Sequence, residues 1–324
     1  MTTSPSDLSF PSPPDYAPFK VGPFRLSMGL MPLELKDWIE PNAQCAVELK
    51  EKERLLTERH DEVFAVLPEA DPGSAEALAL LVGYLPSRFP ELYRRNGDRL
   101  DNLATGQRWV IHDTPLHPLD LAGRLVQEDL CLMQWQAHTQ VYHLVGASLC
   151  FPTRWRLADK IGKPLNTIHA PIPGYAEQLA PTMDKFFDRL KVEKPVWRLN
   201  WSLMDDPTLF QPTGQGRTGV NTDITPENAG DSIWLRIERQ TLRRLPHTRD
   251  ILFTIRVYVR PLAHLATQPD RAAQFAAALR ALPPSMRLYK SLPPFIEAAL
   301  TWLDRAVAKN GRKTTPPYAA PLSE

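Results

Sequence analysis

The sequence predicts an α+β protein built on one antiparallel sheet of about five strands, with helices at both ends of the chain. Residues 195–204 alternate between apolar and polar side chains, as a half-buried strand does. Residues 232–242 and 251–260 repeat this alternation on either side of a short turn, which predicts an antiparallel hairpin. Residues 46–60 and 270–282 instead carry apolar side chains at helical spacing. Strands in the middle, with helices before and after them, are typical of the α+β class.

The chain is long enough and apolar enough to bury a large core. It has 324 residues, of which 43% are hydrophobic and 23% charged, close to the average of globular proteins. Its 38 Lys and Arg against 37 Asp and Glu give a net charge of +1, so the composition predicts no overall attraction to nucleic acid or to an anionic membrane. The 33 prolines are about twice the usual share of roughly 5%, which favours short elements joined by fixed turns.

Both ends of the chain have polar compositions that predict flexible segments. Residues 1–18 are rich in Ser, Pro and Asp and lack a signal-peptide layout, so we expect a disordered leader. Residues 310–324 are expected to form a flexible tail, which leaves residues 19–309 as a single domain. No apolar run approaches the roughly 18 residues that a membrane span needs. The three cysteines have neither cluster spacing nor the density of a secreted disulfide framework, which favours a cytoplasmic protein.

In the first half of the chain the pattern changes from helix to strand. After the helix at 46–60, Ser74 is expected to cap a second helix that Pro86 ends. Residues 130–134 and 141–151 are apolar runs rich in β formers, separated by a polar turn, and they predict two paired strands.

In the second half the strands give way to helices again. Residues 211–230 are polar and rich in Gly and Thr, and are expected to form a loop or flap. After the hairpin, the helical pattern returns at 270–282 and at 293–308.

The segment between two predicted strands, residues 168–175, has an unusual composition. Pro171 and Pro173 follow His169 closely, and we expect them to hold that histidine in a rigid, extended stretch. A helix is then expected to open near Tyr175, with Pro181 kinking or restarting it.

Several well-known catalytic and binding motifs are missing from the sequence. No GxGxxG string directly follows a predicted strand, and no GxxxxGK[ST], HExxH or GxSxG string occurs, so no dinucleotide or triphosphate site is predicted. The pairs His112/His117 and His138/His143 are each five residues apart, a spacing that does not stack two imidazoles on one helix face.

The residues that remain as candidates each have a structural and a functional interpretation. His169 is either a hydrogen-bonded structural residue or an axial ligand to haem iron, which needs one neutral imidazole on a stiff backbone. The strand arginines either line a solvated face, with Glu238 as an ion-pair partner, or form a clamp for carboxylates. They are Arg198, Arg236, Arg239 and Arg256.

Seven strings of residues, taken together, resemble one protein family. They are FRLSMGL at 24–30, YLPSRFP at 84–90, QEDL at 127–130, CFPTRW at 150–155, IHAPIPGY at 168–175, PVWRLNW at 195–201 and ERQTLRRLP at 238–246. In this order, from about residue 24 to residue 262, they resemble the α-subunit of haem-dependent oxidative N-demethylase and its relatives.

The resemblance implies a PAS-like domain that binds haem b, with its iron, and acts as a monooxygenase-like oxidoreductase. In that family's characterised activity, a small secondary amine is oxidised with O2, and formaldehyde is released. Electrons come from NADPH through a separate reductase subunit that carries flavin and an iron–sulfur cluster. The resemblance therefore implies no flavin or NADPH on this chain. The balanced charge and the lack of a membrane span predict neither nucleic acid nor membrane among its partners.

The resemblance also suggests roles for residues of the cofactor site. His169 lies in a matching string and is expected to be the proximal iron ligand, with His247 as the second choice. Arg198 and Arg239 are expected to contact the haem propionates or a distal hydrogen-bond network.

Two residues are expected on the substrate side. Glu177 would hold a protonated amine with its carboxylate, and Tyr175 would donate a hydrogen bond to bound oxygen, although both follow His169 closely in the chain. Two other functions stay open at this stage: a haem-PAS module that senses gas or redox state without catalysis, and a relative that has lost haem and serves as a scaffold.

Overall fold

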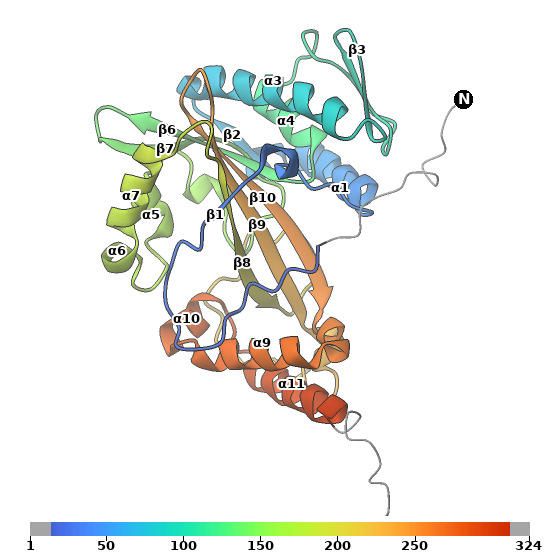
Figure 1. Cartoon of the computed structure of the whole chain (residues 1–324), viewed down its shortest axis with the longest axis vertical. Coiled ribbons are helices and arrows are strands. Elements are labelled where there is room, and N and C mark those ends of the chain that lie inside the picture. The colour runs from blue at the N-terminus through green and yellow to red at the C-terminus, as the bar shows by residue number, and fades with distance from the viewer. Residues whose placement is uncertain (1–13, 312–324) are drawn as a thin grey trace, which may run out of the picture.

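A computed structural model describes residues 14–311 of the chain. Its centre is a seven-stranded antiparallel sheet with the strand order β1-β8-β9-β10-β6-β7-β2 (Figure 1). The strands are β1 (Met31–Pro32), β2 (Phe64–Val66), β6 (Asp129–Gln136), β7 (Val141–Ser148), β8 (Val196–Met204), β9 (Trp234–Arg244) and β10 (Ile251–Pro261).

The α+β class is confirmed, but the sheet has seven strands rather than about five. The five long strands correspond to the five that the alternation and the apolar runs predicted. The two additional strands, β1 and β2, lie at the sheet edges and have only two and three residues. Strands this short carry too few residues for a recognisable alternation, because the period of two needs several repeats to stand out.

The predicted antiparallel hairpin is confirmed. β9 and β10 pair antiparallel from Arg244 opposite Ile251 to Trp234 opposite Pro261. The turn between them is closed by a hydrogen bond from the Leu245 amide to the Asp250 carbonyl, 2.8 Å long. These two strands are the longest in the sheet and reach from one end of the molecule to the other (Figure 1).

Helices at one end of the long strands cover a first hydrophobic core. They are α1 (Cys45–Glu58), α2 (His60–Val63), α3 (Asp71–Arg88) and α4 (Pro118–Leu125). α3 starts three residues before Ser74, which is fully buried inside it, and continues past Pro86, so both predicted boundaries are wrong. Pro72 explains the earlier start, because a proline suits the first helical turn, where its missing N–H costs nothing.

A small second sheet lies beside this end and was not predicted. Its order is β3-β4-β5, with β3 (Tyr93–Asn96), β4 (Arg99–Asn102) and β5 (Arg108–Val110). Short 3₁₀ helices join several elements of the chain: η2 (Leu35–Asp37), η3 (Pro68–Ala70), η4 (Leu157–Asp159) and η5 (Leu262–Thr267).

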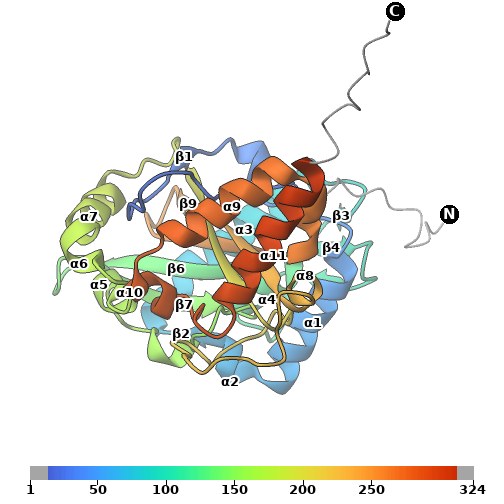
Figure 2. The same cartoon turned by 90° about the horizontal axis from the view of Figure 1, so that it is seen from below.

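The opposite end of the long strands is covered by the C-terminal helices and a second core. These helices are α9 (Pro269–Ala281), α10 (Pro284–Tyr289) and α11 (Ile296–Gly311), joined by the short α8 (Ala229–Ser232). Figure 2 shows α9 and α11 lying side by side across this end. β9 contributes to both cores, Leu242 to the first and Leu235 to the second, so the long strands connect them.

A third group of helices covers one side of the sheet between the two ends. It comprises α5 (Leu165–His169), α6 (Tyr175–Gln178) and α7 (Ala180–Arg189) (Figure 1). His169 is the last residue of α5, so the expectation of an extended backbone at this position is wrong. The prolines restrict only the residues directly before them, and even Ala170 keeps a helical conformation. Pro181 lies in the first turn of α7, as a restarted helix requires.

The predicted leader and tail lie largely outside the described residues, which exclude 1–13 and 312–324. Residues 14–18 follow the surface without regular structure, and two of them contact the sheet. Asp15 lies 2.8 Å from Arg260, and the Tyr16 hydroxyl donates a 2.6 Å hydrogen bond to Glu40. Within the described part of the chain, no helix is both long and apolar enough to cross a bilayer.

Candidate functional site

A cavity of the described structure lies between the sheet and the helical group α5–α7. Its volume is about 300 Å³, at the lower end of the roughly 300–1,000 Å³ typical of ligand pockets. Strands β6 to β10 form one wall, and α5, α6, α7 and α10 contribute the others. Most of the lining is apolar, with Met133, Leu144, Phe151, Met183 and Phe253 among its side chains.

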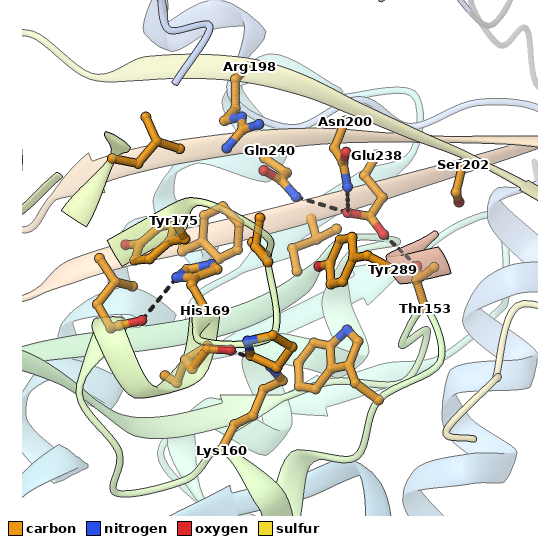
Figure 3. Close-up of a pocket in the computed structure, with 18 of the residues that line it drawn as sticks. Thr153, Lys160, His169, Tyr175, Arg198, Asn200, Ser202, Glu238, Gln240 and Tyr289 are labelled. Atoms are coloured by element: carbon orange, nitrogen blue, oxygen red, sulfur yellow. Dashed lines mark hydrogen bonds between the residues drawn. The ribbon is translucent and has the colours of Figure 1, made fainter. Parts of the chain in front are cut away.

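The polar side chains of the sheet wall come from one face of two neighbouring strands. Arg198, Asn200 and Ser202 alternate with the apolar residues of β8 and line the cavity. Glu238 and Gln240 of β9 line it as well, and the register sets Asn200 opposite Glu238. The polar side chains of β8, which alternate with its apolar ones, therefore face a cavity instead of bulk solvent (Figure 3).

His169 faces this cavity from the end of α5. Its Nδ1 lies 3.0 Å from the carbonyl oxygen of Leu165, one helical turn earlier. A carbonyl oxygen only accepts, so Nδ1 carries the proton, and the lone pair of the neutral ring is on Nε2. Within residues 14–311, Nε2 has no hydrogen-bond partner. Burial, reinforced by the nearby cations of Lys160 and Arg198, lowers the His169 pKa to about 4, so the imidazole is neutral at physiological pH.

Tyr175 packs directly on His169. The two rings are stacked with centroids 4.9 Å apart and an interplanar angle of 29°. The Tyr175 hydroxyl is buried without a hydrogen-bond partner among the described residues. Burial, with Asp184 nearby, raises its pKa to about 12, so the phenol keeps its proton. The structure thus brings together two of the predicted residues, on the same side of the cavity (Figure 3).

Basic side chains outnumber acidic ones around the cavity. Arg198 has a buried Nε without a hydrogen-bond partner in the described part of the chain, and burial lowers its pKa. Lys160 and Lys290 also line the cavity, and each donates a hydrogen bond to a backbone carbonyl: Lys160 to Ile168 at 2.9 Å, Lys290 to Trp201 at 2.6 Å. Arg154, which lies 2.8 Å from Asp205, is already paired. Among the described lining residues, Glu238 is the only carboxylate.

Two of the predicted site residues lie away from the cavity. Arg239 points to the opposite face of β9 from Glu238 and Gln240, as strand alternation requires. There its Nε lies 3.0 Å from Glu40, and its guanidinium also donates to the carbonyls of Trp38 and Asp37. Glu177 is exposed on α6 and does not line the cavity.

The other two strand arginines and the second-choice histidine also lie elsewhere. Arg236 and Arg256 are fully buried and hydrogen-bonded, Arg236 to the Phe151 carbonyl at 2.7 Å and Arg256 to Glu48 at 2.7 Å. They are therefore structural cations rather than residues of a solvated face. His247 is exposed at the hairpin turn, where its amide donates to Glu76.

Sequence reasoning missed several residues of the cavity. Glu238 could have been found, because it alternates with Arg239 on a predicted strand and so must face the other way. Lys290 and Tyr289 carried no comparable signal. Tyr289 is the last residue of the short helix α10 and Lys290 follows it directly, and only the packing of the C-terminal helices brings them to β8.

Comparison with protein-family models gives one match. Residues 29–300 match a family described as haem-dependent oxidative N-demethylase, alpha subunit-like. The matched range includes the whole main sheet and every residue that lines the cavity except Leu26 and Ser27, which precede it.

Proposed function

The chain belongs to the haem-dependent oxidative N-demethylase α-subunit-like family, and we therefore propose that it binds haem b in the cavity between the sheet and α5–α7. We further take it to be an enzyme that oxidises a small secondary amine with O2 and releases formaldehyde. The proposal rests above all on the state of His169. Its imidazole is neutral, its Nδ1 donates to a backbone carbonyl, and its Nε2 is open to a largely apolar cavity.

The residues of the cavity fit the chemistry of haem. An iron ligand must be a neutral imidazole, and a carbonyl behind Nδ1 is the usual partner that fixes the ring's orientation and tautomer. The macrocycle needs apolar walls, and its two propionates need cations. Arg198 meets the need for a cation, because its buried Nε lacks a hydrogen-bond partner within the described residues and a propionate carboxylate would supply one. We therefore propose that His169 would ligate the haem iron through Nε2 and that Arg198 would pair with a propionate.

In this proposal, three of the predicted site residues do not have the roles first expected of them. Tyr175 stacks on His169 and would position the imidazole, since it lies on the ligand's side of the cavity. Arg239 and Glu177 do not line the cavity, so we assign them no contact with haem or substrate. Residues 19–309 are taken as one PAS-like domain of a cytoplasmic protein.

The reaction requires electrons that this chain has no motif to collect. For a secondary amine, R–NH–CH3 + O2 + 2e⁻ + 2H⁺ gives R–NH2 + CH2O + H2O. When bound, haem supplies the site for O2 binding and one-electron chemistry. The family description names an alpha subunit, which supports a multi-subunit enzyme. We propose that the partner is a flavin and iron–sulfur reductase that takes its electrons from NADPH.

The test is amine turnover by the haem-loaded protein. With dimethylamine, O2 and a flavin reductase as electron donor, we expect formaldehyde and methylamine in equal amounts, both dependent on the protein and the amine. A protein that binds haem but forms no formaldehyde with any of a panel of small secondary amines would contradict the enzymatic proposal. It would favour the gas- or redox-sensing alternative.

A further inference from the structure

Glu238 occupies an unusual position in the cavity. It is 9% exposed, lies in the middle of β9, and is the one carboxylate among the described lining residues. Gln240 Nε2 donates to its Oε2 at 2.9 Å and Asn200 Nδ2 donates to the same oxygen at 3.3 Å. Thr153 Oγ1 donates to Oε1 at 2.5 Å. Figure 3 shows these contacts at the wall of the cavity.

All three partners of this carboxylate are uncharged. They fix its orientation, and within residues 14–311 no Lys, Arg or His nitrogen lies within 4.0 Å of its oxygens, although Arg198, Arg236 and Lys290 attract it from farther away.

Two other buried carboxylates do have a cationic partner: Glu48 pairs with Arg256 at 2.7 Å and Asp120 with Arg124 at 2.6 Å. Glu128 and Asp250, which do not line the cavity, have no ion pair among the described residues either, so Glu238 differs from them by its place at the cavity. A buried charge is costly unless it is paired, so a cationic ligand in the cavity would complete the site.

The surroundings of Glu238 suit an alkylated ammonium ion. Phe151, Trp155 and Tyr289 line the same cavity, and aromatic faces attract ammonium groups that carry alkyl substituents. An N–H of such a cation would donate to the carboxylate, while its methyl groups would contact the aromatic and apolar walls.

We infer that Glu238, and not Glu177, binds the protonated ammonium group of the amine substrate. This inference rests on the proposed function, since it places the amine in the cavity assigned to haem. Asn200, Gln240 and Thr153 are positioning residues, because they hold the carboxylate and leave it anionic.

The experiment is calorimetric titration of dimethylammonium chloride at pH 7 into the haem-loaded protein. Glu238→Gln keeps the shape of the side chain and removes its charge, and we expect the Kd to rise at least tenfold. Glu177→Gln removes the rival carboxylate, and we expect an unchanged Kd. Acetate, an anion of similar size, should show no dependence on Glu238.

Two further measurements keep the result interpretable. Haem content and circular dichroism are recorded for each variant; if Glu238→Gln does not fold, Glu238→Asp takes its place and should show an intermediate Kd. A wild-type Kd in the Glu238 variant, or a loss confined to Glu177→Gln, would overturn the inference. A wild-type protein without a haem band would refute the proposed function instead, and the same titration of haem-free protein would still decide whether Glu238 binds the amine.

Discussion

The imidazole of His169 donates from Nδ1 to the carbonyl oxygen of Leu165, 3.0 Å away, and this contact fixes which nitrogen faces the cavity. The acceptor belongs to the first residue of α5, a helix of five residues, and the donor to its last. The short helix thus positions the ring by its own geometry, since residues four apart lie on the same helix face.

Replacing His169 with Ala should remove the proposed iron ligand and weaken haem binding at least tenfold. The measurement is titration of haem into the purified protein, followed by the Soret band. His112→Ala is the matched control, because that side chain is 82% exposed and remote from the cavity lining. Equal haem affinity and an unchanged spectrum in the His169 variant would refute the assignment.

The arginines at 198 and 239 should respond differently to the same substitution. Arg198→Met removes a cation with an unsatisfied Nε from the cavity, so haem affinity should fall about five-fold or more while Tm changes little. Arg239→Met leaves Glu40 without its buried partner, which should lower the free energy of unfolding by about 3 kcal/mol. Its folded fraction should bind haem normally. Thermal unfolding and haem titration of both variants check this; the reverse pattern would contradict the placement of the two side chains.

Amine affinity should rise with pH because Lys290 loses its charge. Burial lowers the pKa of Lys290 to about 8. The repulsion of Arg198 also lowers it, while the attraction of Glu238 acts in the opposite direction. At pH 7 the Lys290 ammonium opposes a second cation near Glu238; above pH 8 that repulsion fades. We expect dimethylammonium to bind roughly two- to five-fold more tightly at pH 9 than at pH 7, the size of a moderately screened charge pair.

Lys290→Met tests this explanation. The variant should bind the amine at pH 7 as tightly as the wild type does at pH 9, with little further change between the two values. Tyr289, which also faces Glu238, has a pKa raised to about 12 by burial and does not titrate in this range. A pH dependence that persists in the variant would assign the effect to another group.

Two helical glycines offer a test of the packing between the helices and the sheet. A Cβ at Gly123 would lie 2.0 Å from Ser148 Oγ, where α4 crosses β7, so Gly123→Ala should lower the free energy of unfolding by about 1–3 kcal/mol. At Gly83 of α3 a Cβ would meet nothing within 4 Å, and Gly83→Ala should raise that free energy by about 1 kcal/mol. Denaturant unfolding of both variants gives the comparison; a stabilising Gly123→Ala would show that α4 does not pack closely on β7.

The long elements of this fold are predictable from local pattern, and its cavity is predictable only in part. β8, β9 and β10 have enough residues for the alternation to show, whereas β1 has two. The same alternation assigns Glu238 and Arg239 to opposite faces, but only the packing of α5 and α6 shows which face is the cavity wall. Lys290 reaches the cavity through the docking of α10 on β8, a contact between segments about 90 residues apart that no local pattern encodes.

The central claim, that this cavity holds a redox-active haem on His169, is tested most directly by an absorption spectrum. Protein supplied with haem is recorded before and after reduction with dithionite. We predict a Soret band that shifts on reduction and is lost in His169→Ala. A spectrum with only the protein band after haem titration, in a protein that circular dichroism shows to be folded, would contradict the claim and leave the chain as a member of the family without its cofactor.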